Sequence, residues 1–222
     1  MPARFVNLDR QTPMLLPCDL REWLPADHIV HLLLEAVEQI PTAHFRVNQR
    51  GTGSEQYPPT MMLALLIYAY ATGRFGSRTI EAATHSDVAV RFLCANTHPD
   101  HDSICAFRAN NKAAFQAAFV QVLELAHELK LTRVGTISVD GTKLQANAKE
   151  QMAHRMKTAV GKNLYKLRKQ TVEPVFGIIK EVLGFRRFLM RGKAKVELEW
   201  LLVCVSYNLK RLFNLKTQAA AG

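Results

Sequence analysis

Only one stretch of this 222-residue sequence has the alternating, β-branched pattern of a β-strand. Residues 134–139, "VGTISV", lead into Asp140 and a following glycine, which predicts a short strand that ends at Asp140. In the rest of the chain, the apolar residues recur at helical spacing. A lone strand is marginally stable in water. The sequence therefore predicts a mainly α protein.

The first 130 residues are expected to form helices that proline and glycine separate. One amphipathic helix is predicted over residues 28–40, and Pro41 stops it. A strongly apolar helix is predicted over residues 61–73, with Thr60 as its cap and Gly73 at its end. Its apolar run is about half of the roughly 20 residues that a membrane-spanning helix needs, so we expect a buried helix and no membrane contact.

Short helices separated by tight polar turns are expected next. Ser77 can cap the first, Ser86 or Asp87 the second, and Asp102 or Ser103 opens the third. This pattern is typical of a DNA-binding helix-turn-helix and equally of a small helical bundle, and the sequence leaves both open. A long helix is then predicted over residues 113–131, with Phe115, Phe119, Val122, Leu123 and Ala126 on one face.

The positive charge lies in the last third of the chain. The net charge is +10. Residues 1–142 contain 12 basic and 14 acidic side chains, a net of −2, whereas residues 143–222 contain 17 and 5, a net of +12. Such asymmetry favours binding to a polyanion, because basic side chains that meet phosphates release counterions. A solvated basic face is the alternative.

Cysteine usage and the N-terminus indicate an intracellular protein. The cysteines are spread singly, which predicts free thiols without a zinc site: they are Cys18, Cys94, Cys105 and Cys204. The N-terminus has no continuous apolar core of a secretory signal. We therefore expect a cytoplasmic, nucleoid-associated location.

Two acidic residues are candidates for chemistry. Asp140 would lie at the rim of a sheet, where ligands usually bind, although a strand-end aspartate can also simply satisfy a turn. Glu173 precedes Pro174 and so lies at the positive end of a predicted helix. Lys180 follows two turns later, within about 20° on the same helix edge. A carboxylate for a cation and a lysine for a phosphate suit phosphoryl transfer on DNA.

These residues carry a family resemblance. The chain resembles the DDE transposases of bacterial insertion sequences in two blocks that together cover nearly all of it. "ISVDGTKLQANA" is similar to the first catalytic strand, and "TVEPVFGIIK" keeps the glutamate and the lysine seven residues later, as Glu173 and Lys180. Tyr165 and Arg168 resemble the tyrosine and arginine before that glutamate, with Arg168 one position further away and Lys169 in the expected place.

The resemblance implies a fold and a chemistry. It implies a ribonuclease H-like fold in which three acids hold two Mg²⁺ ions for DNA strand cleavage and transfer. In this chain it assigns the catalytic and metal-ligand positions to Asp140 and Glu173. It also implies DNA at the terminal repeats as a partner, and a second copy or an intact transposase as protein partners.

The second catalytic aspartate of the family is absent. Asp140 is the last aspartate of the chain, and Glu150 is the sole acid between it and Glu173. The 32 intervening residues are too few for the remaining strands and crossovers of a five-stranded sheet. An internal deletion between Ala148 and Met152 explains both facts. We expect impaired catalysis, because each metal would lose carboxylates that fix it.

The predicted organisation has two parts. Residues 1–132 are expected to form a helical N-terminal domain, and residues 133–222 a truncated ribonuclease H-like α/β remnant with few strands and basic helices. Candidate DNA contacts are basic side chains of the second part: Lys143, Arg168, Lys169, Lys180, Arg186, Arg187 and Arg191. A non-catalytic DNA-binding remnant and an unrelated helical DNA-binding regulator are the alternative functions.

Overall fold

The computed structural model describes residues 20–46, 56–129 and 174–221. These three ranges contain helices and no strand, which confirms the mainly α fold class. The strand predicted over residues 134–139 lies outside the described residues. The domain boundary predicted after residue 132 lies there too, so the ribonuclease H-like remnant and the division into two domains stay predictions.

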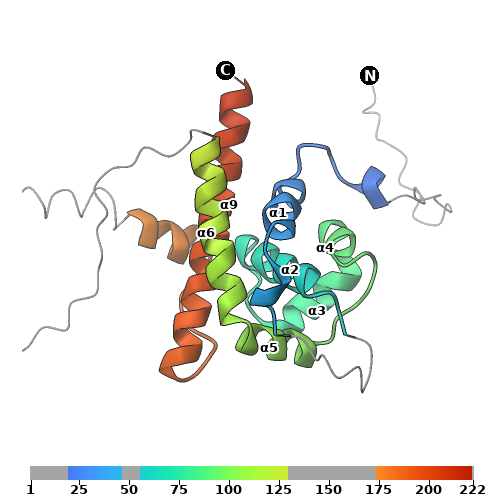
Figure 1. Cartoon of the computed structure of the whole chain (residues 1–222), viewed down its shortest axis with the longest axis vertical. Helices are drawn as coiled ribbons and strands as arrows, with labels where there is room; N and C mark the ends of the chain where they lie inside the picture. Colours follow the sequence, from blue (N-terminus) through green and yellow to red (C-terminus); the bar gives the residue numbers. More distant parts are fainter. Residues whose placement is uncertain (1–19, 47–55, 130–173, 222) are drawn as a thin grey trace, which may run out of the picture.

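The helices of residues 29–110 lie beside one another on one side of the molecule, and the helix of residues 112–128 stands next to them (Figure 1). Most of the predicted helices are present, with small shifts of their ends. In chain order the elements are η1 (Leu20–Trp23), α1 (Ile29–Glu38), η2 (Thr42–His44), α2 (Pro59–Ala71), α3 (Ser77–Ser86), α4 (Val88–Leu93), α5 (His101–Asn110) and α6 (Lys112–Glu128).

Helix α2 forms the centre of the core. Its residues from Met62 to Ala71 are all buried, because α1, α4, α5 and the C-terminal helix α9 (Lys193–Ala221) surround it. The predicted cap was wrong: Pro58 precedes the helix and Pro59 is its first residue, a position where a missing N–H costs nothing. Gly73 ends the helix as predicted, with φ +80°. Within the described ranges, none of the helices combines the length and apolar character needed to cross a bilayer.

Two of the short helices, α4 and α5, begin at aspartate caps. The Asp87 carboxylate accepts a hydrogen bond from the Val90 N–H at 3.1 Å, which confirms it as the cap of α4. The predicted cap of α3 was wrong: Ser77 is the first residue of the helix, and Gly76, which has no side chain to cap it, precedes it. Helix α5 was predicted to open at Asp102 or Ser103, but Asp100 is its cap and accepts from the Ser103 N–H. The sequence "PDHDS" offers several capping residues, and only the backbone path selects among them.

The third described range starts with an irregular helix. Residues 174–177 form a single α-helical turn that widens into the π-helix η3 (Ile178–Val182). The Leu183 N–H donates to the Ile178 carbonyl, five residues back, at 3.0 Å. The predicted apolar face is therefore only partly buried: Ile179 and Leu183 reach the core, whereas Phe176 and Val182 are exposed. A π-turn rotates side chains away from the 3.6-residue spacing on which that prediction rested.

Helices α6 and α9 run parallel and side by side (Figure 1). Near their N-terminal ends, Lys112 and Glu197 form an ion pair at 3.3 Å. Their buried residues alternate spacings of three and four, the pattern of a coiled-coil seam: Phe115, Ala118, Val122 and Leu125 on α6, and Leu198, Leu202, Val205, Leu209 and Leu212 on α9. One exception to the face predicted for α6 is Leu123, which is exposed.

Candidate nucleic-acid interface

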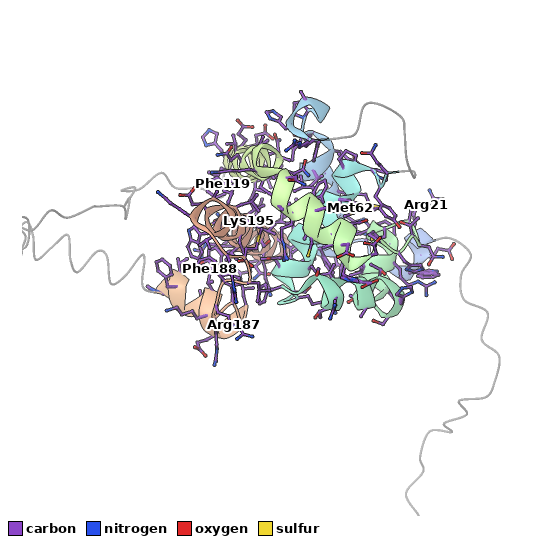
Figure 2. All side chains as sticks on the ribbon, turned by 90° about the horizontal axis from the view of Figure 1, so that it is seen from below. Arg21, Met62, Phe119, Arg187, Phe188 and Lys195 are labelled. Atoms are coloured by element: carbon purple, nitrogen blue, oxygen red, sulfur yellow. The ribbon has the colours of Figure 1, made fainter. Side chains whose placement is uncertain are left out.

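The structure describes four of the predicted site residues. All four are exposed: Lys180 lies in η3, and Arg186, Arg187 and Arg191 lie in residues 183–192, the joining segment between η3 and α9. Figure 2 shows Arg187 and the neighbouring Phe188 at one edge of the molecule. The other predicted positions lie outside the described residues: Asp140, Glu173, Lys143, Arg168 and Lys169.

The described residues contain no candidate site for two magnesium ions. In the described part of the chain, no three His, Cys, Asp or Glu side chains lie together as metal ligands. Beyond it, the sequence offers Asp140 and Glu173, with Glu150 as the sole other acid between them. Two Mg²⁺ ions each need several oxygen ligands, and the family resemblance implies three acids to hold them.

The four described basic side chains differ in whether an acidic side chain pairs with them. Arg186 pairs with Glu181 at 2.8 Å, but both side chains are about 70% exposed, so the pair contributes little. Among the described residues, no carboxylate lies within ion-pair distance of Lys180, Arg187 or Arg191. Within the described ranges, these three cations therefore have no acidic side chain that would compete with an anion from solution.

The arginines of the short helices are mostly committed to the protein itself. Arg74 pairs with Asp87 at 2.7 Å, and Arg91 donates to Asn96 and lies over the Trp23 ring. Arg108 is buried. These contacts leave few cations on α3–α5 for DNA, and they favour the bundle over the helix-turn-helix interpretation of this region.

A buried carboxylate holds the joining segment in place. Glu199, on α9, has none of its surface exposed. Its Oε2 accepts hydrogen bonds from the Leu189 and Met190 N–H groups at 2.9 and 3.1 Å. Its Oε1 accepts one from the Tyr70 hydroxyl of α2 at 3.1 Å. Two backbone amides beside the basic residues are thus anchored to the core.

The network continues through Tyr70 to α5. The Arg108 guanidinium donates to the Tyr70 hydroxyl at 3.0 Å and to the Phe75 carbonyl at 2.8 Å. Burial raises the pKa of Tyr70, which keeps the phenol protonated as a donor to Glu199. Sequence reasoning missed these residues. The sequence did contain a signal for Glu199. This acidic residue lies next to Leu198 and within one turn of Leu202 and Val203, so it falls on the apolar face of the helix.

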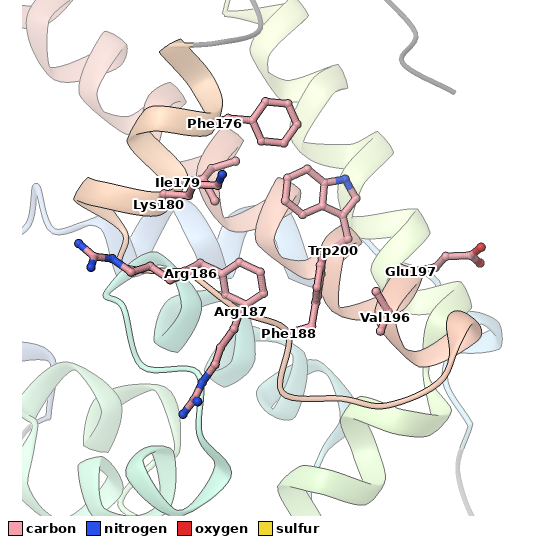
Figure 3. A pocket seen from close by; sticks show the side chains of 10 residues that line it. Phe176, Ile179, Lys180, Arg186, Arg187, Phe188, Val196, Glu197 and Trp200 are labelled. Carbon is pink, nitrogen blue, oxygen red and sulfur yellow. The ribbon is translucent and has the colours of Figure 1, made fainter. Parts of the chain in front are cut away.

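Next to the joining segment lies an open cavity of about 490 Å³ (Figure 3). Aromatic rings form one side of it, and basic side chains extend on the other. The Phe176 and Trp200 rings stack with centroids 5.6 Å apart and an interplanar angle of 11°. Phe188 meets the Trp200 ring edge-on, and Phe185 lies buried behind Phe188.

The described cysteines take part in no cluster of metal-ligating side chains. Cys94, Cys105 and Cys204 are free thiols, as predicted, and Cys18 lies outside the described residues. Burial raises the pKa of Cys94 to about 12 and that of Cys204 to about 11. Neither thiol forms an appreciable amount of the reactive thiolate at neutral pH.

Comparison with protein families matches two successive parts of the chain. Residues 18–110, which include α1–α5, match a transposase domain, DUF772. Residues 130–213, which include η3, the joining segment and most of α9, match the transposase DDE domain. No curated protein and no solved structure matches the chain. Both matched families are transposase families, and the chain belongs to the DDE transposases of insertion sequences.

Proposed function

We propose that this transposase binds DNA through the basic surface of Lys180, Arg187 and Arg191, and that its strand-cleavage chemistry is impaired. The observation that carries the DNA proposal is the exposure of these three cations, which have no carboxylate partner among the described residues. The net charge of +12 over residues 143–222 supports the same conclusion. Phosphates of the terminal repeats are the ligands that such a surface fits.

The impairment is inferred from the donor set. Asp140 and Glu173 remain as metal-ligand positions, and the aspartate expected between them is missing. The family generally acts with divalent metal ions. With fewer carboxylates, each ion would be held loosely, and we expect strand cleavage to be slower by orders of magnitude.

The DNA proposal is tested by a salt series with the full chain and a terminal-repeat duplex. Affinity should fall steeply with salt, and Arg187→Ala and Arg191→Ala should each lower the slope of log K against log salt by about one. Arg78→Ala, an exposed arginine on α3, serves as the matched control and should leave the slope unchanged. A slope that falls only in the Arg78 variant would favour the helix-turn-helix interpretation instead.

Catalysis is tested with the same duplex and Mg²⁺. We expect little or no nicking above a protein-free control. Robust nicking that both Asp140→Ala and Glu173→Ala abolish would show that the remaining acids suffice, and would contradict the proposed impairment without affecting the DNA-binding proposal.

A further inference from the structure

We propose that the aromatic cavity beside the joining segment binds one unpaired base of a DNA strand. The base would stack on the ring surface of Phe176, Phe188 and Trp200, and Lys180 and Arg187 would contact the flanking phosphates. This inference rests on the proposed DNA binding and adds a second mode of contact to it, because duplex phosphates alone need no aromatic surface.

The rings provide the surface that a base requires. Phe176 is 38% exposed and Phe188 is 44% exposed, although burial of either ring would stabilise the protein. Phe185, with 5% exposure, supports Phe188 from behind, with ring centroids 5.4 Å apart. Large aromatic side chains that stay exposed around a hollow usually mark a binding site. Stacking on such rings tolerates any base, because every base has a π-face.

The charges around the rings favour a nucleic-acid strand over a protein. Three cations line the cavity: Lys180, Arg186 and Arg187. Glu197 is the lone acid in its lining, and it already pairs with Lys112 at 3.3 Å. A second copy docking face to face would bring the same cations together, which is unfavourable. An unpaired nucleotide supplies a ring for the aromatic side chains and phosphates for the cations, and Figure 3 shows both kinds of side chain around the cavity.

Only an unpaired base can use this site. In a duplex, each base is already stacked on its neighbours and shows its edges, not its face, to the grooves. The proposal therefore predicts that the cavity distinguishes a single strand from an abasic strand of equal length, since the two have the same phosphates and differ only in their bases.

Tryptophan fluorescence gives a direct readout. The chain contains two tryptophans, so Trp23→Phe leaves Trp200 as the sole one. With this full-length variant, an oligothymidylate of about ten nucleotides should quench the Trp200 emission, and the abasic strand should not. Equal quenching by both strands would overturn the proposal while leaving backbone binding intact. Absence of binding to either strand and to the duplex would overturn both proposals.

Substitutions then locate the contact. Phe188→Ala should weaken oligothymidylate binding about tenfold and leave abasic-strand binding unchanged. Phe188→Leu keeps the apolar bulk without the aromatic face, so a similar loss is expected in a chain that folds normally. Leu189→Ala is the matched control, since Leu189 is 43% exposed but does not line the cavity. Equal losses in the Leu189 variant, or concentration-dependent self-association that Phe188→Ala removes, would assign the surface to a protein contact and overturn the proposal.

Discussion

The Glu199 side chain has no exposed surface, so its carboxylate oxygens need hydrogen-bond donors from the protein. The Tyr70 hydroxyl and the Leu189 and Met190 N–H groups satisfy them. Glu199→Ala would leave these donors unpaired and open a cavity, so we expect a loss of about 3 kcal/mol in the free energy of unfolding. For a chain of this size that corresponds to a thermal midpoint roughly 8 °C lower, measurable by circular dichroism.

Two variants separate this role from a general effect of removing charge on α9. Glu199→Gln keeps one oxygen acceptor and should lose clearly less than the alanine variant. Glu197→Ala removes an exposed acid two residues earlier and should change stability by less than about 0.5 kcal/mol. Equal midpoints for the two alanine variants would show that the hydrogen bonds of Glu199 contribute little.

His28 links stability to pH at the start of α1. Its Nδ1 accepts a hydrogen bond from the Val30 N–H at 3.3 Å, and its ring lies beside that of Tyr68. Burial, and next the neighbouring His31, lower the pKa of His28. The folded state therefore binds a proton less readily than the unfolded state, and this contribution is complete above pH 6.5 and declines as the pH falls below it.

The test compares His28 with an uncharged cap. Asparagine can cap the helix in the same way without titrating. Thermal midpoints of the wild type and of His28→Asn, taken at about pH 7.5 and about pH 5.5, should show a larger acid-induced decrease in the wild type. If acid lowers both midpoints equally, other groups account for the pH dependence.

At the scale of the elements, the end of α2 requires a glycine, because its backbone is left-handed and lies close to another carbonyl. Gly73 has φ +80°, and a Cβ there would lie 3.1 Å from the Leu183 carbonyl oxygen. Gly73→Ala should therefore lower the free energy of unfolding by about 1.5 kcal/mol. Gly177 is the matched control, because its φ of −59° is helical and a Cβ would meet nothing within 4 Å.

Opposite signs are expected for the two glycine variants in urea unfolding. Gly177→Ala should stabilise the chain by about 0.5 kcal/mol, since alanine favours helical backbone. If Gly73→Ala instead leaves the free energy of unfolding unchanged or raises it as Gly177→Ala does, the Leu183 carbonyl moves readily and the left-handed conformation at Gly73 carries little strain.

Local signals explain which elements the sequence could predict. Helix α2 and its glycine end, and the Asp87 cap of α4, depend on residues within a few positions of one another. The Glu199 network does not: its bond to Tyr70 joins residues 129 positions apart. The aromatic cavity could not be predicted either, because its rings come from different segments: Phe176 precedes η3, Phe188 follows it, and Trp200 lies on α9. The sequence did predict the cations Lys180, Arg186 and Arg187 that line the cavity, but not the aromatic rings beside them.

At the scale of the whole molecule, the two family blocks share one core. Helix α9 belongs to the block that matches the DDE domain, yet it packs along α2 and α6 of the preceding helices. Its Ser206 hydroxyl donates to the Ile67 carbonyl of α2 at 3.0 Å, and the Lys210 ammonium donates to the Ala71 carbonyl at 3.1 Å. Separation of the blocks would expose the apolar side of α2 to water and break these bonds.

This shared core predicts a single unfolding transition for the described helices. Trp23 precedes α1, and Trp200 lies on α9, so each reports on one block. Trp200→Phe leaves Trp23 as the fluorescent probe, and Trp23→Phe leaves Trp200. In each variant, the urea midpoint of the tryptophan fluorescence should equal the urea midpoint of circular dichroism at about 222 nm. Two independent domains divided after residue 132 would instead give separate transitions for the two probes. Coincident transitions are expected because neither block can bury its apolar surface without the other.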